Sequence, residues 1–319
     1  MSEKTQAAAL LKEWDKILVM SHASPDGDTL GSASALLRGL ASLGKQVQFF
    51  CADPVPEKFG YLFEGLTLGE FEPDHVMTVD VADKNLLGKA PQELVDRIEL
   101  AIDHHGTHVP FTQTRWVEPE AAATVEMIYA LLEELEVEVD QPTADCLYTG
   151  LTTDTGCFRY RSVTPRTHRI AGALLELGAR NGDINQWMFE SKTKGQVEAE
   201  RLVMDTMEFS WEGRCALIQV PLSVYPRTGV KESDLDGLAS RPREIQGVVL
   251  GLTLKEKEGG KVKVSVRANP PADASRLCSR FGGGGHQGAA GCTLEMPLDQ
   301  ARQAMEQACG EYLQELGLL

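Results

Sequence analysis

Short apolar runs alternate with amphipathic stretches through the first half of the chain. Runs such as Lys16–Met20 (KILVM) are continuously apolar, which is typical of a strand buried on both faces. Stretches such as Leu30–Leu43 are rich in Ala and Leu and end before a glycine, as helices do. The alternation predicts a parallel β-sheet covered by helices. The expected strands are Lys16–Met20, Gln46–Phe50, Met77–Val81, Ile98–His105 and Thr114–Val117, and the expected helices are Ala7–Trp14, Leu30–Leu43, Lys58–Phe63, Ala121–Leu135, Pro142–Thr153, Thr167–Leu177 and Asp183–Phe189.

The pattern changes near Trp211, after which β-branched residues alternate with polar ones. This predicts strands over Cys215–Pro221, Ile245–Lys255 and Lys261–Ala268, the last two joined by a hairpin, followed by a helix over Leu298–Leu316. Thr193–Phe209 is typical of a long connecting helix. We therefore expect an α/β protein with a parallel-sheet domain over residues 1–190, a helical linker over 191–211 and a smaller α/β domain over 212–319.

Ionisable residues directly follow three of the expected strands. In open α/β sheets, ligand sites form outside the carboxyl ends of parallel strands, so we expect these residues along one edge. Carboxylates combined with imidazoles suit Mn²⁺ or Mg²⁺ better than a metal that prefers thiolates. Any one of the aspartates taken alone could instead be a helix cap, Asp28 included. The residues are His22, Asp26 and Asp28 in SHASPDGDTLGS, Asp80 in MTVDV, and Asp103, His104 and His105 in IELAIDHH.

Two further segments carry candidate chemistry before the change of pattern. Asp154 lies in an expected polar turn, in TTDTGCFRY, with Gly156 just after it. The basic residues that follow are by default solvated side chains on a helix, and their nearness to Asp154 makes a phosphate-facing patch the alternative. They are Arg159, Arg161, Arg166, His168 and Arg169.

The second domain contains the glycine-rich segment FGGGGHQGAAG. Consecutive glycines expose backbone N–H groups and permit close approach of a ligand, and a helix starting near Gln287 would direct its N-terminus at an anion. A flexible loop is the alternative. We expect an anion pocket here, with charge supplied by two arginines. Its residues are Gly283, Gly284, Gly285, His286, Arg267 and Arg280.

Composition limits the partners and the compartment. Lys and Arg number 31 against 47 Asp and Glu, a net charge of −16, which argues against tight binding of long duplex nucleic acid. The 7 cysteines are scattered without a C-x-x-C pair, as in a protein of a reducing, cytoplasmic setting. The N-terminus does not have the pattern of a signal peptide, and no apolar run is long enough to span a membrane.

Together, H-x3-D-G-D, a strand-end Asp, D-H-H, D-T-G-x-F and G-G-G-G-H resemble the DHH phosphoesterase family, in the branch with the DHH-associated C-terminal domain. The resemblance covers nearly the whole chain. The two-domain length of the chain is similar to that of the oligoribonuclease/pAp phosphatase (nanoRNase) type. The resemblance implies two Mn²⁺ ions, with Mg²⁺ as an alternative. By this resemblance one ion would be held by His22, Asp26 and Asp80, and the other by Asp28, Asp80, His104 and Asp154, with Asp80 bridging both.

The resemblance also implies roles beyond the metal ligands. His105 would contact the scissile phosphate or assist the leaving group, and Asp103 would orient a neighbouring imidazole. The glycine-rich segment with His286 and Arg267 would hold a terminal phosphate, and Arg280 and Arg159 are further candidates for contacting the substrate. Another three histidines, His75, His108 and His168, are left unassigned.

The expected function is hydrolysis of very short single-stranded RNA or DNA oligonucleotides to mononucleotides, with pAp as a second substrate. A phosphodiesterase for cyclic dinucleotides is the nearest alternative. A long-strand exonuclease and an inorganic pyrophosphatase or polyphosphatase are disfavoured, the former because the chain is acidic. A non-catalytic nucleotide- or RNA-binding module is the alternative of a different class. The sequence is compatible with a homodimer and gives no reason to expect a membrane partner.

Overall fold

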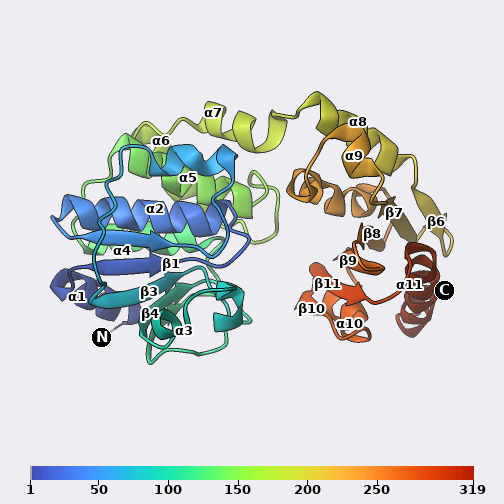
Figure 1. The fold of residues 1–319 in the computed structure, drawn as a ribbon, viewed down its shortest axis with the longest axis horizontal. Helices are drawn as coiled ribbons and strands as arrows, with labels where there is room; N and C mark the ends of the chain where they lie inside the picture. Colours follow the sequence, from blue (N-terminus) through green and yellow to red (C-terminus); the bar gives the residue numbers. More distant parts are fainter. Residues whose placement is uncertain (1) are drawn as a thin grey trace. The chain divides into compact units, whose positions relative to one another are not determined.

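The computed structural model describes residues 2–319, which divide into two compact units. The first unit runs to Ser191 and the second from Lys192 to Leu319, and Figure 1 shows a separate sheet in each. Within residues 2–319, no helix combines the length and the apolar character that crossing a membrane requires.

The first unit is built on five parallel strands in the order β2-β1-β3-β4-β5. All residues of the inner strand β1 are buried, as its continuous apolar run predicts. It pairs in parallel with β2 on one side and β3 on the other, so Ile17 lies between Val47 and His75. The parallel sheet expected from the sequence is therefore confirmed. Its strands are β1 (Ile17–Met20), β2 (Val47–Phe50), β3 (His75–Val79), β4 (Ile98–Asp103) and β5 (Thr114–Val117).

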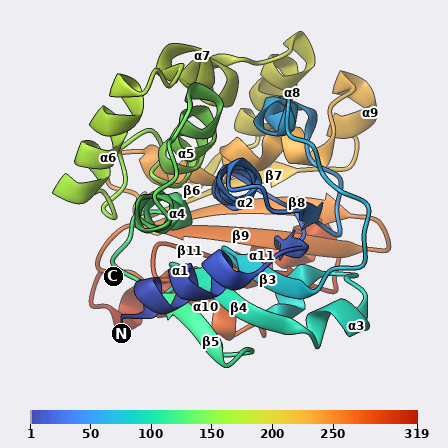
Figure 2. The same cartoon turned by 90° about the vertical axis from the view of Figure 1, so that its left-hand side faces the viewer.

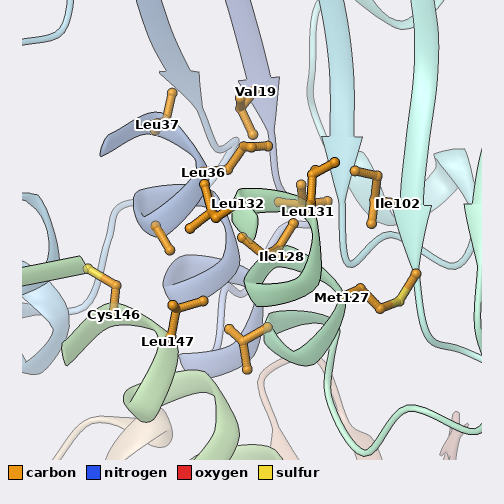
Figure 3. Close-up of a cluster of buried hydrophobic side chains, with 14 of the residues drawn as sticks. Val19, Leu36, Leu37, Ile102, Met127, Ile128, Leu131, Leu132, Cys146 and Leu147 are labelled. Atoms are coloured by element: carbon orange, nitrogen blue, oxygen red, sulfur yellow. The ribbon is translucent and has the colours of Figure 1, made fainter. Parts of the chain in front are cut away.

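Helices cover one face of this sheet, and short helical turns cover the other. Alternate residues of β1 point to opposite faces, so Val19 packs into the larger core, whereas Leu18 packs against Leu87. Figure 3 shows Val19 and Ile102 facing side chains of α2 and α4, and Figure 2 shows these two helices nearly end-on. The helices of the first unit are α1 (Glu3–Glu13), α2 (Gly27–Ser42), η1 (Glu57–Phe63), η2 (Lys84–Leu87), α3 (Gln92–Val95), α4 (Thr124–Glu134), α5 (Gln141–Asp154), α6 (Pro165–Glu176), α7 (Asn181–Asn185) and η3 (Gln186–Glu190).

Close packing of α2 against α5 brings two segments of the candidate site together. A side chain at Gly31 would lie 2.5 Å from the carbonyl oxygen of Cys146, so only glycine permits this approach. A side chain at Gly150 would likewise lie 2.9 Å from Oδ1 of Asp28. Helix α5 extends through Asp154, which is its last residue and not part of a following turn as expected from the sequence.

The second unit is a six-stranded mixed sheet in the order β10-β11-β9-β8-β7-β6, with helices packed against it. Strands β7 and β8 are parallel, and the other neighbours are antiparallel. The strands are β6 (Glu208–Ser210), β7 (Cys215–Val220), β8 (Leu250–Lys257), β9 (Lys261–Ala268), β10 (Gly284–His286) and β11 (Ala289–Leu294). The helices are α8 (Lys194–Met204), α9 (Val224–Thr228), η4 (Glu232–Ser240), η5 (Pro242–Glu244), α10 (Ala274–Ser279) and α11 (Leu298–Glu315).

Three expectations for the second half differ from the structure. The connecting helix stops at Met204, because the chain then enters the edge strand β6. Strand β8 begins at Leu250, later than expected, because the residues before it form the turn η5 and a loop. No helix starts near Gln287: the glycine-rich segment is a hairpin of β10 and β11, in which Gly284 pairs with Gly291.

Candidate metal centre and active site

The carboxyl ends of β1, β3 and β4 bring the ionisable residues to one edge of the first sheet. His22 follows β1, Asp80 follows β3, and Asp103 is the last residue of β4. Three groups of residues could each hold a metal ion, because within each group the donor atoms lie within 4.8 Å of one another. They are His22, Asp26 and Asp80; Asp28, His104 and Asp154; and Asp80, His104 and His105.

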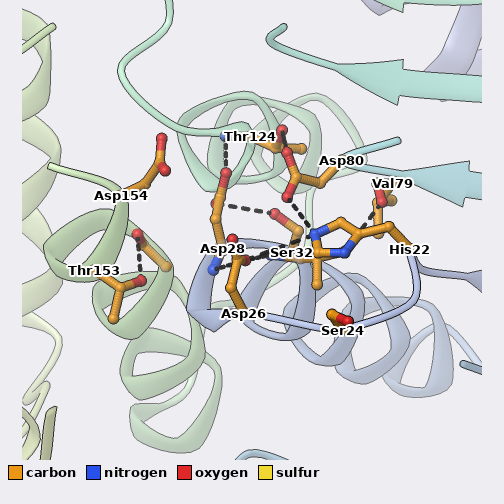
Figure 4. Close-up of polar contacts among 12 residues, drawn as sticks. His22, Ser24, Asp26, Asp28, Ser32, Val79, Asp80, Thr124, Thr153 and Asp154 are labelled. Carbon is orange, nitrogen blue, oxygen red and sulfur yellow. Dashed lines mark hydrogen bonds and ion pairs between the residues drawn. The ribbon is translucent and has the colours of Figure 1, made fainter. Parts of the chain in front are cut away.

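Asp80 lies at the centre of this arrangement. Its Oδ2 atom is 3.7 Å from Nε2 of His22, and its Oδ1 atom is 3.8 Å from Nε2 of His104. The carboxylate therefore faces two imidazoles, those of His22 and His104, which belong to different donor groups. The hydroxyl of Thr124 donates a hydrogen bond of 2.9 Å to Oδ1 and fixes its direction, a contact that could not be anticipated from the chain alone. Figure 4 shows Asp80 and Thr124 beside His22, Asp26 and Asp28.

Two helix N-termini orient the remaining aspartates of the first loop. The cap of α2 is Asp26, whose Oδ1 accepts hydrogen bonds from the backbone of Asp28 and Thr29. The cap interpretation of Asp28 is therefore wrong. Asp28 lies in the first turn of α2, and its buried carboxylate reaches the start of α4, where it accepts hydrogen bonds of 2.7 and 3.0 Å from the N–H groups of Thr124 and Val125. Unpaired N–H groups and the helix dipole favour a carboxylate there.

Backbone carbonyls fix the ring orientation of both central histidines. Nδ1 of His22 lies 2.8 Å from the oxygen of Ala23, and Nδ1 of His104 lies 3.1 Å from the oxygen of Ala121. Since a carbonyl only accepts, each Nδ1 carries the hydrogen, and each Nε2 presents a lone pair to the carboxylates when the ring is neutral. This is the tautomer that a metal-ligating histidine needs.

The carboxylates repel one another strongly enough to alter their proton affinities. Burial, together with the charges of Asp80 and Asp154, raises the pKa of Asp28 well above its usual range. Burial and the charges of Asp80 and Asp26 raise the pKa of Asp154 to about 8. Burial lowers the pKa of His22, but the hydrogen bond to Asp80 and the charge of Asp26 outweigh it and raise the value to about 9. Such a cluster of oxygen and imidazole donors fits divalent cations, which would compensate its negative charge.

Asp103 and His105 form a second layer behind this cluster. Nδ1 of His105 donates a hydrogen bond of 2.7 Å to Oδ1 of Asp103 and lies 3.7 Å from Oδ1 of Asp80. His108, unassigned from the sequence, donates from Nδ1 to the other oxygen of Asp103, also at 2.7 Å. Its position three residues after the D-H-H motif is the one signal that could have suggested it.

The structure places the expected substrate-binding residues unevenly. His286 and Arg267 are the register partners of Ala289 on its two sides, so both belong to one row of the second sheet. Arg280 is not directed toward this row: its guanidinium pairs with Glu315 at 2.8 Å and lies over Tyr312. Its expected contribution to a glycine-segment pocket is therefore not supported.

The basic residues after α5 differ in their surroundings. Arg159 is exposed, and its Nε donates to the carbonyl oxygen of Gly156 at 2.6 Å. Arg166 is instead paired with Glu118 and Glu126 on the flank of α4. The two arginines that follow Asp154 most closely, Arg159 and Arg161, are both exposed.

Comparison with known proteins identifies the chain. The DHH family, N-terminal domain, matches residues 16–151, and the DHHA1 domain matches residues 217–312. The bifunctional oligoribonuclease and PAP phosphatase NrnA of Thermus thermophilus is 31% identical over 95% of this chain and 92% of that protein. The chain belongs to the DHH family of phosphoesterases. It is thus a hydrolase of phosphodiester bonds, which decides against the non-catalytic binding module.

Two further relatives of this DHH phosphoesterase are informative. The structure of an exopolyphosphatase-related protein from Bacteroides fragilis has a TM-score of 0.91 at 24% identity, covering 99% of this chain and 97% of that one, and so has the same fold. The cyclic-di-AMP phosphodiesterase GdpP of Geobacillus thermodenitrificans is 25% identical over 96% of this chain. The match spans 49% of GdpP, so this DHH phosphoesterase corresponds to about half of that protein.

Proposed function

We propose that this DHH phosphoesterase hydrolyses very short oligonucleotides to mononucleotides and also removes the 3′-phosphate of pAp. The observation that carries the proposal is the Asp80 carboxylate, which faces His22 with one oxygen and His104 with the other. The similarity to the Thermus thermophilus oligoribonuclease and PAP phosphatase, which extends over both units, supports this choice of substrate.

Two divalent cations fit the donor atoms at the edge of the first sheet. One would be held by His22, Asp26 and Asp80, and the other by Asp28, Asp80, His104 and Asp154. We favour Mn²⁺, with Mg²⁺ as an alternative, because the donors are hard oxygens with one imidazole in each group. When bound, the cations would activate the attacking water and neutralise charge on the phosphate.

His105 is the residue that we place against the scissile phosphate. Its side chain is partly exposed, and Asp103 holds its Nδ1, so Nε2 is the ring atom directed at a substrate. Burial lowers the pKa of His105, but the hydrogen bond to Asp103 and the charge of Asp80 outweigh it and raise the value to about 9. A protonated imidazole near neutral pH stabilises negative charge and can give its proton to the leaving oxygen.

In the second unit, we assign the rest of the substrate to the β10–β11 hairpin. Arg267 and His286 flank Ala289 in adjacent strands, which supports a shared contact with one phosphate. The N–H of Gly283 already donates to the carbonyl oxygen of Cys278, so Gly284 and Gly285 of the edge strand β10 would supply the neutral backbone donors. Arg159 is retained as a candidate contact from the first unit because it is exposed and follows Asp154 closely.

Hydrolysis of cyclic dinucleotides is the second candidate. Similarity to the cyclic-di-AMP phosphodiesterase along 96% of this chain favours it. The same metal ligands would serve either substrate, so the difference lies in how the nucleotide is held. A direct comparison of substrates therefore separates the two candidates.

The test measures mononucleotide release from a 5′-labelled RNA dinucleotide in Mn²⁺, with pAp, cyclic di-AMP and an RNA of about 24 nucleotides in parallel. We expect fast cleavage of the dinucleotide and pAp, at least about tenfold slower cleavage of the long RNA, and loss of all activity in EDTA. Faster opening of cyclic di-AMP would replace the proposed substrate and leave the metal ligands in place. Equal kcat/KM for short and long RNA would favour a processive exonuclease.

A further inference from the structure

The buried carboxylate of Asp103 is shared by two imidazoles. Its Oδ1 atom lies 2.7 Å from Nδ1 of His105, and its Oδ2 atom lies 2.7 Å from Nδ1 of His108. The side chain of Asp103 is 0% exposed, that of His105 27% and that of His108 3%. Asp103 therefore links an imidazole at the candidate site to one in the protein interior.

The direction of both hydrogen bonds follows from the charge on the carboxylate. An ionised carboxylate only accepts hydrogen bonds. Both Nδ1 atoms therefore carry hydrogens, and both rings are fixed by the same acceptor.

Packing alone does not account for an imidazole at position 108. The ring of His108 lies 5.4 Å from that of Phe111, and its Nε2 atom is buried without a hydrogen-bond partner among the described residues. Burying an unpaired polar atom costs about 1–3 kcal/mol, which an apolar side chain would avoid. The contact that an apolar side chain could not make is the Nδ1 hydrogen bond to Asp103.

The local backbone holds His108 in this position. Its N–H donates to the carbonyl oxygen of His105 at 3.1 Å, and the N–H of Val109 donates to Ala82 at 2.8 Å. The turn after the D-H-H motif is thus closed on itself and tied to the loop that follows β3. His108 can therefore act as a fixed donor to Asp103.

We propose that His108 is a positioning residue for the phosphoesterase reaction. It holds Oδ2 of Asp103, so that Oδ1 keeps its hydrogen bond to the Nδ1–H of His105 and the ring in one orientation. Without His108, Oδ2 of Asp103 loses its donor, so the carboxylate is held only by His105 and fixes the direction of that ring less firmly. This inference rests on the proposed role of His105. Because His108 acts through Asp103, its loss should lower kcat and leave KM and metal binding nearly unchanged.

Three substitutions at this position separate the hydrogen bond from the ring. In His108→Asn, the amide nitrogen is attached to Cγ as Nδ1 is, so it can donate to Asp103. In His108→Gln, the amide lies one bond further away, and His108→Leu has no donor. Phe111→Leu is the matched control, because it changes the packing on the ring and leaves Nδ1 intact.

Activity is measured on the RNA dinucleotide and on bis(p-nitrophenyl) phosphate, a generic phosphodiester. We expect the Leu and Gln variants to lose about 10–100-fold in kcat with KM within about twofold, and the Asn variant and Phe111→Leu to stay within about threefold of the original protein. Equal losses in the Asn and Gln variants would overturn the proposal. This pair decides the question even if His108→Leu fails to fold.

A second readout does not depend on turnover. Nitrogen NMR of histidine-labelled protein reports whether the Nδ1–H of His105 is held in a hydrogen bond and protected from exchange with water. We expect a protected Nδ1–H signal in the original protein and in His108→Asn, and a faster-exchanging signal in His108→Gln. An unchanged His105 signal in His108→Gln would contradict the positioning role. If no phosphodiester is cleaved at all, the proposed function fails, and the NMR signal still decides the role of His108.

Discussion

At the scale of single residues, the backbone of Asp80 is the most constrained feature of the candidate site. Its φ of +58° lies in the left-handed region, which costs a non-glycine residue about 1 kcal/mol. The N–H of Asp80 donates to the carbonyl oxygen of Ile102 at 2.8 Å and holds this conformation. The turn directs the carboxylate between His22 and His104, so the strain is retained where the shared carboxylate is needed.

Replacing this carboxylate tests the metal assignment. Asp80→Asn should reduce turnover by at least about 100-fold, because an amide cannot bridge two cations. The fold should persist, since the amide has the same shape and one charge is removed from a repulsive cluster. Turnover, circular dichroism and Mn²⁺ binding are measured. Asp83→Asn, in the same loop, is the control that keeps activity, and near-normal turnover in Asp80→Asn would refute the two-cation arrangement.

Proton affinities at the site predict how metal binding depends on pH. Folding raises the pKa of His22 from 6.5 to about 9 and that of Asp154 from 3.8 to about 8, so both groups hold protons near pH 7 that a cation must displace. The affinity for Mn²⁺ should therefore rise as the pH is raised towards about 8 to 9, roughly tenfold per pH unit for each proton released, and level off above that range.

The stability of the metal-free protein in EDTA should change with pH in the opposite direction and fall as the pH rises. Because both pKa values are higher in the folded protein, each proton stabilises the folded state at low pH. The contribution of His22 is complete below 6.5 and is lost as the pH rises through about 9, and that of Asp154 is lost between 3.8 and about 8. Calorimetric titration with Mn²⁺ and thermal melting in EDTA at several pH values measure both effects. A pH-independent Mn²⁺ affinity would contradict the assignment of these ligands.

At the scale of elements, the β10–β11 hairpin uses its glycines for two different purposes. A side chain at Gly283 would lie 2.2 Å from the carbonyl oxygen of Gly291, and one at Gly285, where φ is +144°, would lie 2.6 Å from that of Ala289. A side chain at Gly284 would meet nothing within 4 Å. Gly283 and Gly285 are thus needed for the hairpin itself, and Gly284 has room for a side chain.

This difference yields a matched pair of substitutions. Gly283→Ala should destabilise the second unit by about 1–3 kcal/mol, because backbone atoms must shift to accept the methyl group. Gly284→Ala should leave the melting temperature unchanged and raise KM for the substrate, since the methyl group only obstructs access to the backbone. Thermal melting and steady-state kinetics on the RNA dinucleotide test both. If Gly284→Ala had no effect on KM, the hairpin would not be the substrate contact that we propose.

At the scale of the whole molecule, each of the two units has a hydrophobic core of its own. The core of the first unit contains residues of the parallel sheet, such as Val19 and Ile102, and a core of the second contains Leu252 and Val264. The expected metal ligands all belong to the first unit, and the glycine hairpin belongs to the second. A cation should therefore stabilise only one of the two units directly.

Calorimetric unfolding tests this separation. We expect two transitions, of which Mn²⁺ raises only that of the first unit, by about 2.7 kcal/mol when its concentration is 100 times the dissociation constant. Asp80→Asn should abolish that shift, which assigns the transition. An equal shift of both transitions would show that the cation site involves the second unit as well.

The class of the fold, and the meeting of the ionisable residues at one sheet edge, could both be predicted from the sequence. Continuous apolar runs encode buried parallel strands locally, and polar residues at their carboxyl ends must meet at one edge of the sheet. The positions of His22, Asp80 and His104 follow from that rule without knowledge of the packing. The order of the motifs was also sufficient to predict the family.

The hydrogen-bond partners that hold these side chains could not be predicted from the sequence. Asp28 accepts hydrogen bonds from Thr124 and Val125, which lie 96 and 97 positions further along the chain. Thr124 also donates to Asp80, 44 positions away. Arg280 donates to Glu315 on α11, 35 positions away. The glycine-rich segment became a strand pair because β9 offers it an edge, whereas the local sequence allowed a loop or a helix start. Periodicity is a local property of the chain. The hydrogen-bond and ion-pair partners of these side chains are instead determined by how distant elements pack, and no short segment encodes that packing.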